Sequence, residues 1–137
     1  MNREFLIAMF SSVIWKEKLN DFLRAGGDIN LITKDDGWSL VHYAIYVENH
    51  AAVNWLRSHG ADINMKDYDG CTPLHCAVFC DLDMAILSDL PLEFSTTKFL
   101  LSVGADPLIK DNKGNLPRDL AGHYGVEVQH RFDQVLA

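Results

Sequence analysis

The sequence predicts an all-α solenoid, in which helix-turn-helix units stack side by side and are joined by short β-hairpin loops. Two observations support this prediction. The segments Gly37–Ala44 and Gly70–Ala77 share one pattern and begin 33 residues apart. Each is followed by a copy of a second pattern, at His59–Asn64 and at Val103–Asp106. A recurrence at this period indicates stacked repeats, because one unit is too small to bury its own apolar face.

Four units account for nearly the whole chain. The first has an apolar run, Phe5–Phe10, in place of the pattern that starts at Gly37, as expected of a capping unit. The last begins at Gly114 with an altered copy, which is tolerable where no neighbour stacks on the outer side. The predicted units are an N-terminal cap at residues 1–33, a second repeat at 34–66, a third at 67–110 with an insertion near 82–92, and a C-terminal cap at 111–137.

Each full unit is predicted to run as turn, helix, short loop, helix and extended segment. In the third unit Gly70 supplies the positive φ of a tight turn. Thr72 then caps the first helix, and Pro73 occupies its first position, where a missing N–H costs nothing. Small Ala77 lets a neighbouring helix approach closely, and Gly104 stands where the second helix needs a C-terminal cap.

These patterns resemble the ankyrin repeat. Residues Thr72–Ala77 match the Thr-Pro-Leu-His-x-Ala motif of that family in full, and Gly60–Asn64 match its closing motif, Gly-Ala-Asp-x-Asn. The second unit keeps the capping hydroxyl and the histidine, as Ser39 and His42, but lacks the proline. The resemblance implies a structural role for His42 and His75, whose rings would hydrogen-bond backbone groups and tie neighbouring hairpins together.

The third unit is longer than the second. Gly70 and Gly114 lie 44 residues apart, 11 more than Gly37 and Gly70, and the flanking motifs place the excess near residues 82–92. The apolar residues within it follow helical spacing until Pro91, so we expect an extended first helix or an extra helical turn. Insertions in repeat proteins often form binding surfaces. The residues at this spacing are Leu82, Ala85, Ile86 and Leu90.

The charge of the chain disfavours a nucleic-acid partner. Its net charge is −7, whereas nucleic acids are bound by Lys and Arg side chains that neutralise phosphates. Between Asp67 and Thr97 there are six acidic residues and no Lys or Arg. Such a stripe would attract a basic protein, although it could also be a solvated face that keeps the protein dissolved.

The composition gives expectations about location. No apolar run approaches the roughly 18 residues of a membrane span, and the N-terminal residues lack the cleavage site of a signal peptide. The three cysteines, an odd number, fit a reducing interior better than a disulfide framework. We therefore expect a cytoplasmic protein that does not bind membranes, that acts as a stand-alone binder and that is a monomer when free.

The resemblance implies that partners dock on a concave side, formed by the hairpin tips and the exposed faces of the first helices. Aromatic residues there would act as binding hot spots. Trp38, beside a hairpin glycine, is the strongest anchor, whereas Tyr46 and Phe79 could instead pack between units. The predicted partner-binding residues are Asp35, Asp36, Trp38, Tyr46, Tyr68, Asp69, Phe79, Asp81, Asp83 and Tyr124. The same positions include Val47, Cys71, Cys80, Asn112, Lys113, Asn115 and His123.

A metal- or thiol-dependent site is an alternative from another class. It would use Cys71, His75, Cys76 and Cys80, of which the last three lie together on one helix. A structural zinc site needs four ligands that converge from two segments, however, and His75 is already required by the repeat pattern. Buried cysteines also pack as small apolar residues. No sequence motif of a nucleophile elbow, a phosphate-binding loop or a zinc protease is present.

The sequence thus favours a non-enzymatic protein-binding module with no cofactor and no metal. A preorganised stack loses little entropy on docking. Aromatic anchors flanked by carboxylates would select a partner with a basic, partly apolar patch. One concrete version is a small immunity-type inhibitor that neutralises a basic toxin. A third possibility is a scaffold that self-associates through Leu82, Ile86 and Leu90.

Overall fold

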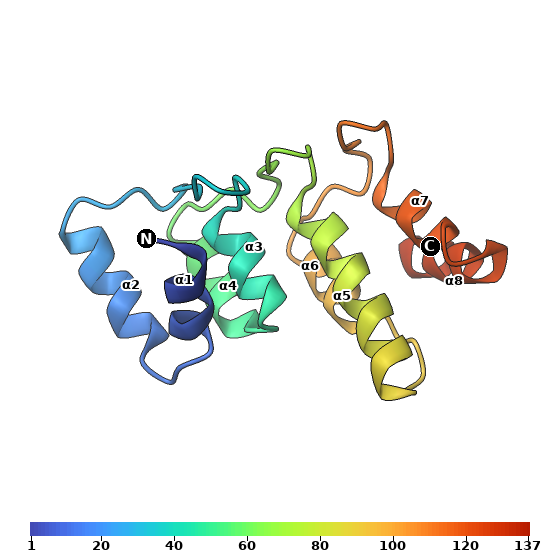
Figure 1. Ribbon diagram of the computed structural model, residues 1–137, viewed down its shortest axis with the longest axis horizontal. Helices are drawn as coiled ribbons and strands as arrows, with labels where there is room; N and C mark the ends of the chain where they lie inside the picture. Colours follow the sequence, from blue (N-terminus) through green and yellow to red (C-terminus); the bar gives the residue numbers. More distant parts are fainter.

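The structure, a computed structural model, describes residues 1–137 and contains eight α-helices in four consecutive pairs (Figure 1). It has no β-sheet, and the only β-bridge joins Ile32 to Ser39. The all-α solenoid predicted from the sequence is confirmed. The pairs are α1 (Arg3–Phe10) with α2 (Trp15–Arg24), α3 (Leu40–Tyr46) with α4 (His50–Ser58), α5 (Pro73–Ser88) with α6 (Ser95–Ser102), and α7 (Pro117–Gly122) with α8 (Val126–Leu136).

The first helices of the four pairs form a continuous row. Helix α3 packs between α1 and α5, and α5 in turn packs against α7. Ala44, Ala77 and Ala121, which occupy equivalent positions in successive first helices, are completely buried. Their small side chains let the helices approach closely, as predicted for Ala77. The row of helices therefore sets the spacing at which the hairpins follow one another.

Two hairpin glycines are required both by conformation and by space. Gly37 and Gly70 have φ angles of 73° and 78°, in the left-handed region that favours glycine. A Cβ atom on Gly37 would lie 2.5 Å from the ring of Tyr68, and one on Gly70 would lie 2.5 Å from the side-chain oxygen of Asn112. Each glycine therefore makes room for a residue of the next hairpin.

The apolar interior falls into two clusters. A core of 20 buried residues extends through the first three pairs, with Leu6, Tyr43, Leu56 and Leu74 among its fully buried members. A separate cluster of six residues joins the third pair to the fourth. That smaller cluster consists of Val78, Leu82, Phe94, Leu120, Ala121 and Phe132.

The insertion lengthens α5, as predicted. Helix α5 has 16 residues, whereas the equivalent α3 has 7. It ends at Ser88, before Pro91, and extends beyond the neighbouring first helices (Figure 1). The predicted apolar stripe is only partly exposed: Ile86 and Leu90 face solvent, but Leu82 is buried in the smaller cluster because the fourth pair packs over it.

The segment that returns from α5 to α6 contains a strained residue. Phe94 has a φ of 53°, in the left-handed region that a bulky side chain rarely adopts. Its ring is buried against Phe132, with the two ring centroids 5.6 Å apart. The burial of this ring offsets the backbone strain and fixes the point at which α6 begins.

Candidate protein-binding surface

A buried histidine links the hairpin of the second unit to that of the third. The Nδ1 atom of His42 accepts a hydrogen bond from the backbone N–H of Ser39 at 3.1 Å, and its Nε2 atom donates to the carbonyl of Cys71 at 3.0 Å. Burial lowers the pKa of His42, which keeps the ring neutral, with one nitrogen accepting and the other donating. This histidine is part of the framework of the surface.

His75 repeats the arrangement one unit later. Its Nδ1 accepts from the backbone N–H of Thr72 at 3.1 Å, and its Nε2 donates to the carbonyl of Asn115 at 3.0 Å. Thr72 precedes the first helical residue, Pro73, as the sequence pattern predicts. Both nitrogens of the ring are therefore already in use, and neither is available to a metal ion.

Backbone hydrogen bonds join the tips of the hairpins directly. The N–H of Tyr68 donates to the carbonyl of Asp36 at 3.1 Å, and the N–H of Asn112 donates to the carbonyl of Asp69 at 2.9 Å. The side-chain amide of Asn112 also donates to the carbonyl of Tyr68 at 2.8 Å. The tips thus form one hydrogen-bonded series, which, with the exposed faces of the first helices, we call the hairpin row.

The closing Gly-Ala-Asp-x-Asn pattern has a similar linking role. The side-chain oxygen of Asn30 accepts from the N–H of Asp62 at 2.9 Å, and that of Asn64 accepts from the N–H of Asp106 at 2.9 Å. The asparagines of the first and second units therefore each hold the loop of the next unit in place.

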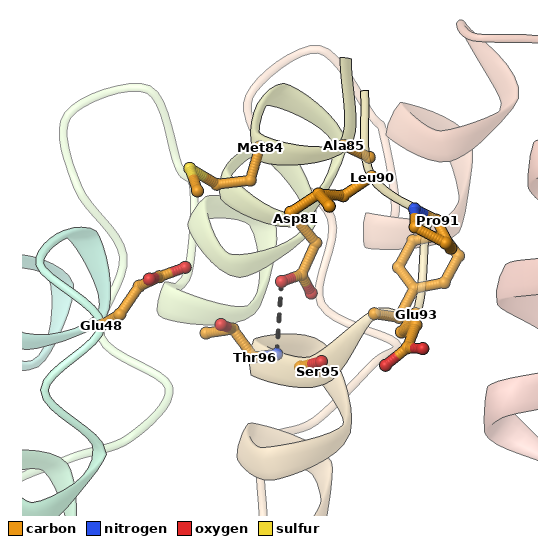
Figure 2. Close-up of a pocket in the computed structure, with 10 residues that line it drawn as sticks. Glu48, Asp81, Met84, Ala85, Leu90, Pro91, Glu93, Ser95 and Thr96 are labelled. Atoms are coloured by element: carbon orange, nitrogen blue, oxygen red, sulfur yellow. Dashed lines mark hydrogen bonds between the residues drawn. The ribbon is translucent and has the colours of Figure 1, made fainter. Parts of the chain in front are cut away.

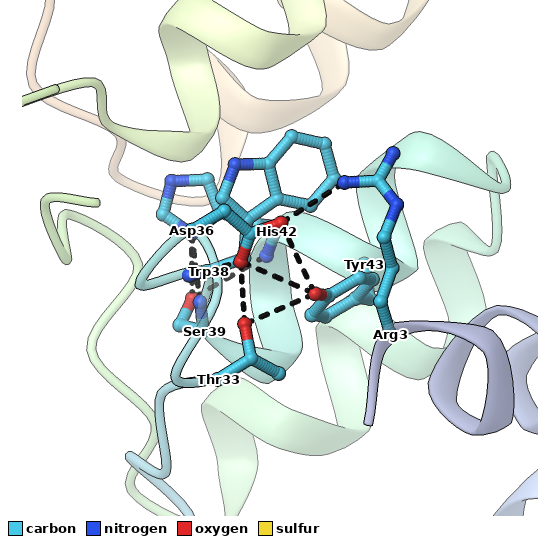
Figure 3. A network of polar contacts seen from close by, with 7 residues as sticks. All are labelled: Arg3, Thr33, Asp36, Trp38, Ser39, His42 and Tyr43. Carbon is cyan, nitrogen blue, oxygen red and sulfur yellow. Dashed lines mark hydrogen bonds and ion pairs between the residues drawn. The ribbon is translucent and has the colours of Figure 1, made fainter. Parts of the chain in front are cut away.

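Trp38, the predicted anchor, lies in a cluster of aromatic and charged side chains (Figure 3). Its ring stacks on His42, with centroids 5.7 Å apart, and contacts Tyr46, also at 5.7 Å. The guanidinium group of Arg3 lies 5.0 Å from the Trp38 ring and forms an ion pair of 2.9 Å with Asp36. Trp38 is only partly exposed, because α1 supplies an arginine that covers it.

The carboxylate of Asp36 is engaged within the protein. It accepts hydrogen bonds from the hydroxyl groups of Thr33 and Tyr43, from the N–H of Trp38 and from the guanidinium of Arg3. Burial by itself raises the pKa of this carboxyl, but the hydrogen bonds, with that of Thr33 the strongest, outweigh it and lower the pKa below 3.8. Asp36 is thus an ionised group that positions the hairpin and has little capacity left for a partner.

The other predicted aromatic residues are exposed. Tyr46, Tyr68, Phe79 and Tyr124 expose between 40% and 56% of their surface. Asp35 and Asp69 are also exposed, and neither forms an ion pair. These residues are accessible to a partner without rearrangement.

A cavity of about 340 Å³ lies between the third and fourth hairpins. It brings Asp69 and Phe79, both predicted as partner-binding residues, next to Lys113 and His123 of the fourth unit. Trp38, Tyr46 and Tyr68 do not line it. The hairpin row therefore offers two separate features, an aromatic cluster around Trp38 and a hollow beside Phe79.

The prediction that Asp81 faces a partner is wrong. Its carboxylate is buried, with 9% of the residue exposed, and it accepts from the N–H of Thr96 at 3.2 Å and from the N–H and hydroxyl of Thr97 at 2.9 and 2.8 Å. It thereby caps α6, whose own N-cap residue, Phe94, has no side chain able to do so. Asp83 is exposed, but it lies on the extension of α5, beyond the part that matches α3.

The cysteines do not form the alternative metal centre. No three histidine, cysteine or acidic side chains lie close enough together to hold a metal ion. Burial raises the pKa of the Cys71 thiol to about 12. A hydrogen bond between Cys76 and Cys80 raises the pKa of the former and lowers that of the latter. Cys76 itself is buried in the larger core, where it packs as an apolar residue.

Sequence reasoning missed Arg3 and the capping role of Asp81. Arg3 lies outside every repeated pattern, and its contacts with Trp38 depend on how α1 packs on α3. For Asp81 a weak signal existed, since the Ser95–Thr97 segment opens a helix without a polar residue at Phe94 to cap it.

None of the eight helices combines the length and the apolar character needed to cross a bilayer.

Comparison with known proteins relates the chain to one family. Residues 12–111 match the family described as ankyrin repeats, in three copies.

Three relatives illustrate the similarity. The chain is 32% identical over 105 residues to protein phosphatase 1 regulatory subunit 27 of Mus musculus, which covers 76% of this chain and 60% of the relative. It is 34% identical over 103 residues to the putative ankyrin repeat protein FPV031 of Fowlpox virus (strain NVSL), covering 72% and 27%. It is 39% identical over 80 residues to the RelA-associated inhibitor of Mus musculus, covering 56% and 9%. The chain therefore spans less than two thirds of each relative.

Proposed function

The chain belongs to the ankyrin repeat family, and we propose that it is a non-enzymatic module that binds another protein through the hairpin row. One observation carries this proposal: exposed aromatic side chains stand along a series of hairpins that hydrogen bonds hold in place. Exposed aromatic residues are enriched among the hot spots of protein interfaces. Tyr68 is the most exposed of them and lies at the centre of the row.

The rigidity of the row supports the same function. Each hairpin is held to the next by a buried histidine and by backbone hydrogen bonds. Little conformational freedom is therefore left to lose when a partner docks, so more of the contact energy contributes to affinity.

The charge of the row indicates the chemistry of the partner. Asp69 follows Tyr68 in sequence and Asp35 lies in the preceding hairpin; their unpaired carboxylates favour a partner with a basic, partly apolar patch. One version of this function is an immunity-type inhibitor that blocks a basic toxin in the cytoplasm. The names of two relatives, a regulatory subunit and an inhibitor, favour a regulatory role of this kind.

Affinity capture with matched variants tests the proposal. The wild type, the double variant Tyr68→Ala/Phe79→Ala and the control Val13→Ala are used as baits in lysate from the source organism. Val13 is an exposed apolar residue in the turn between α1 and α2, and the hollow that it lines contains no residue of the hairpin row. We expect a basic protein with the wild type and the control but not with the double variant. Equal recovery by all three baits, or recovery of acidic proteins only, would contradict the proposal.

A further inference from the structure

A second recessed surface lies at the end of α5 that is remote from the hairpins. A cavity of about 320 Å³ opens between the turn joining α3 to α4, the extension of α5 and the start of α6 (Figure 2). Met84, Leu90 and Phe94 contribute apolar lining, and Glu48 and Glu93 contribute carboxylates. We call this surface the insertion groove, because four of its ten lining residues, Met84, Ala85, Leu90 and Pro91, belong to the insertion.

The apolar side of the groove is unusually exposed. Within residues 84–90, four large apolar side chains expose from 46% to 82% of their surface, and no other stretch of seven residues in the chain holds as many. They are Met84 and Leu90, which line the groove, and Ile86 and Leu87, which lie outside its lining. Contiguous exposed apolar side chains rimmed by polar groups are typical of interaction sites. These side chains are unpartnered in the free protein, while Leu82 and Phe94 anchor the segment in the smaller core.

The acidic groups around the groove have no partner within the chain. Glu48, Glu93, Asp83 and Asp89 take part in none of the four ion pairs of the protein. The carboxylate of Glu48 extends toward Met84 across the groove (Figure 2). Glu93 also lines a second hollow, which contains the cations Lys98 and Arg131, but it forms an ion pair with neither.

The end of α5 adds to this unbalanced charge. Its last turn contains no basic residue, and Asp89 follows it directly. A negative charge therefore stands at the negative end of the helix dipole, where a cation is favoured. A positively charged partner would relieve this repulsion, whereas an acidic one would increase it.

We propose that the insertion groove binds a second protein through a short amphipathic segment, in which arginine or lysine side chains stand beside apolar ones. The apolar side chains of the segment would cover Met84 and Leu90, and its cations would meet Glu48 and Glu93. A second copy of this chain is a poorer occupant, because its own carboxylates, such as Asp83, would face the same carboxylates. Since α5 is about 24 Å long, the groove and the hairpin row can be occupied at once.

A basic amphipathic peptide is the probe for this site. A fluorescent 14-residue peptide of the repeating sequence Leu-Lys-Lys-Leu-Leu-Lys-Leu is titrated into the protein, and a peptide with Glu in place of Lys serves as its control. We expect saturable binding of the basic peptide only, weaker at higher salt. Amide chemical-shift changes are expected at residues 84–94 and at Glu48.

Three variants make the test specific. Leu90→Ser removes an exposed apolar contact and should weaken binding about tenfold, while Glu48→Gln/Glu93→Gln should weaken it about threefold. The control Glu17→Gln/Glu127→Gln removes the same charge at exposed, unpaired sites elsewhere and should leave the affinity unchanged. Circular dichroism confirms that each variant is folded.

Several outcomes would overturn the inference. An equal loss of affinity in the groove and control variants would show that the peptide binds through general charge attraction and not at the groove. Chemical-shift changes at Tyr68 and Phe79 would assign the peptide to the hairpin row. A dimer in light scattering that Ile86→Glu converts to a monomer would assign the exposed side chains to a second copy. Tyr68→Ala/Phe79→Ala should not affect this peptide, so the groove and the proposed function of the row can fail independently.

Discussion

The two ends of α5 differ in how they contact the neighbouring units. At the hairpin end, the bond from His75 to the Asn115 carbonyl reproduces the bond from His42 to the Cys71 carbonyl, both at 3.0 Å. At the other end, the capping of α6 by Asp81 has no counterpart in another unit. The contacts at the hairpin end therefore recur from unit to unit and build the stack. The contacts at the other end, near the insertion, occur in the third unit only.

The difference extends to the interior. The core of 20 residues is shared by three pairs, whereas the cluster that contains Phe132 joins only the third pair to the fourth. In a stack each unit contacts only its neighbours, so stability is a sum of local terms. We therefore expect core truncations at the two ends of α5 to destabilise different helices.

The largest effects should come from truncation of the two cores. Leu74→Ala should cost about 2–5 kcal/mol and Phe132→Ala about 3–5 kcal/mol, since both side chains are completely buried. Hydrogen exchange checks where protection is lost. We expect Leu74→Ala to affect α3 through α6, and Phe132→Ala mainly α7 and α8. An equal loss of protection in α1–α4 for both variants would show that the clusters act as one core.

Removal of either bridging histidine should have the next largest effect. His42→Ala and His75→Ala each leave buried backbone groups unpaired, which costs about 1–3 kcal/mol. Because the two sets of hydrogen bonds match, we expect similar losses in urea unfolding. His123→Ala, at an exposed histidine whose ring forms no hydrogen bond, is the control and should stay within about 0.5 kcal/mol of the wild type. A large difference between His42 and His75 would mean that the repeated contacts are not energetically equivalent.

Loss of the Asp81 carboxylate should destabilise mainly the start of α6. Asp81→Ala removes the cap of α6 and should cost about 0.5–2 kcal/mol, with faster amide exchange at Thr96 and Thr97. The matched control is Asp83→Ala, an exposed acidic residue on the same helix, expected within about 0.5 kcal/mol of the wild type. Comparable effects of the two variants would contradict the capping role.

Stability should fall on mild acidification. Because the pKa of His42 in the folded protein is below 6.5, the unfolded chain binds a proton that the folded chain resists. The stabilisation is therefore complete above about pH 6.5 and is lost as the pH falls toward the folded pKa. Thermal unfolding between pH 7.5 and 5.5 checks this, and His42→Gln should show a smaller dependence. A melting temperature that rises as the pH falls from 7.5 to 5.5 would contradict this prediction.

The smallest change in stability is expected for Arg3→Ala. Its ion pair with Asp36 is partly exposed and is worth about 0.2–1 kcal/mol. The variant should nevertheless uncover the Trp38 ring, so acrylamide should quench the tryptophan fluorescence more strongly, and Trp38→Phe should remove this increase. Arg24→Ala, which removes an exposed ion pair with Asp21, is the control and should leave quenching unchanged.

Much of the repeated end could be predicted from the sequence, because its contacts recur in the sequence itself. Thr72, Pro73 and His75 form a local pattern whose geometry is set within one helical turn. The insertion end could not be predicted in the same way. The partners of Asp81 lie 15 and 16 residues further along the chain, past the break in the period, and nothing local relates them.

The candidate site likewise contains some features that the local sequence predicts and others that depend on tertiary contacts. The exposure of Tyr68 and Asp69 follows from their place at a hairpin tip. The covering of Trp38 by Arg3 depends on a tertiary contact between residues in different units, which no spacing rule describes. The free carboxylates of the insertion were visible as a stretch without basic residues, but only the structure separates the buried Asp81 from the exposed Asp83.

The left-handed backbone of Phe94 has a consequence for synthesis of the chain. Its strain is offset by the packing of its ring in the smaller cluster, in which Phe132 is synthesised 38 residues later. The start of α6 therefore lacks its final support until α8 has emerged, and the third unit is completed by the fourth. A released chain that ends before residue 132 would lack this support, so proteases should cleave the segment from Asp89 to Phe94 faster than in the full chain.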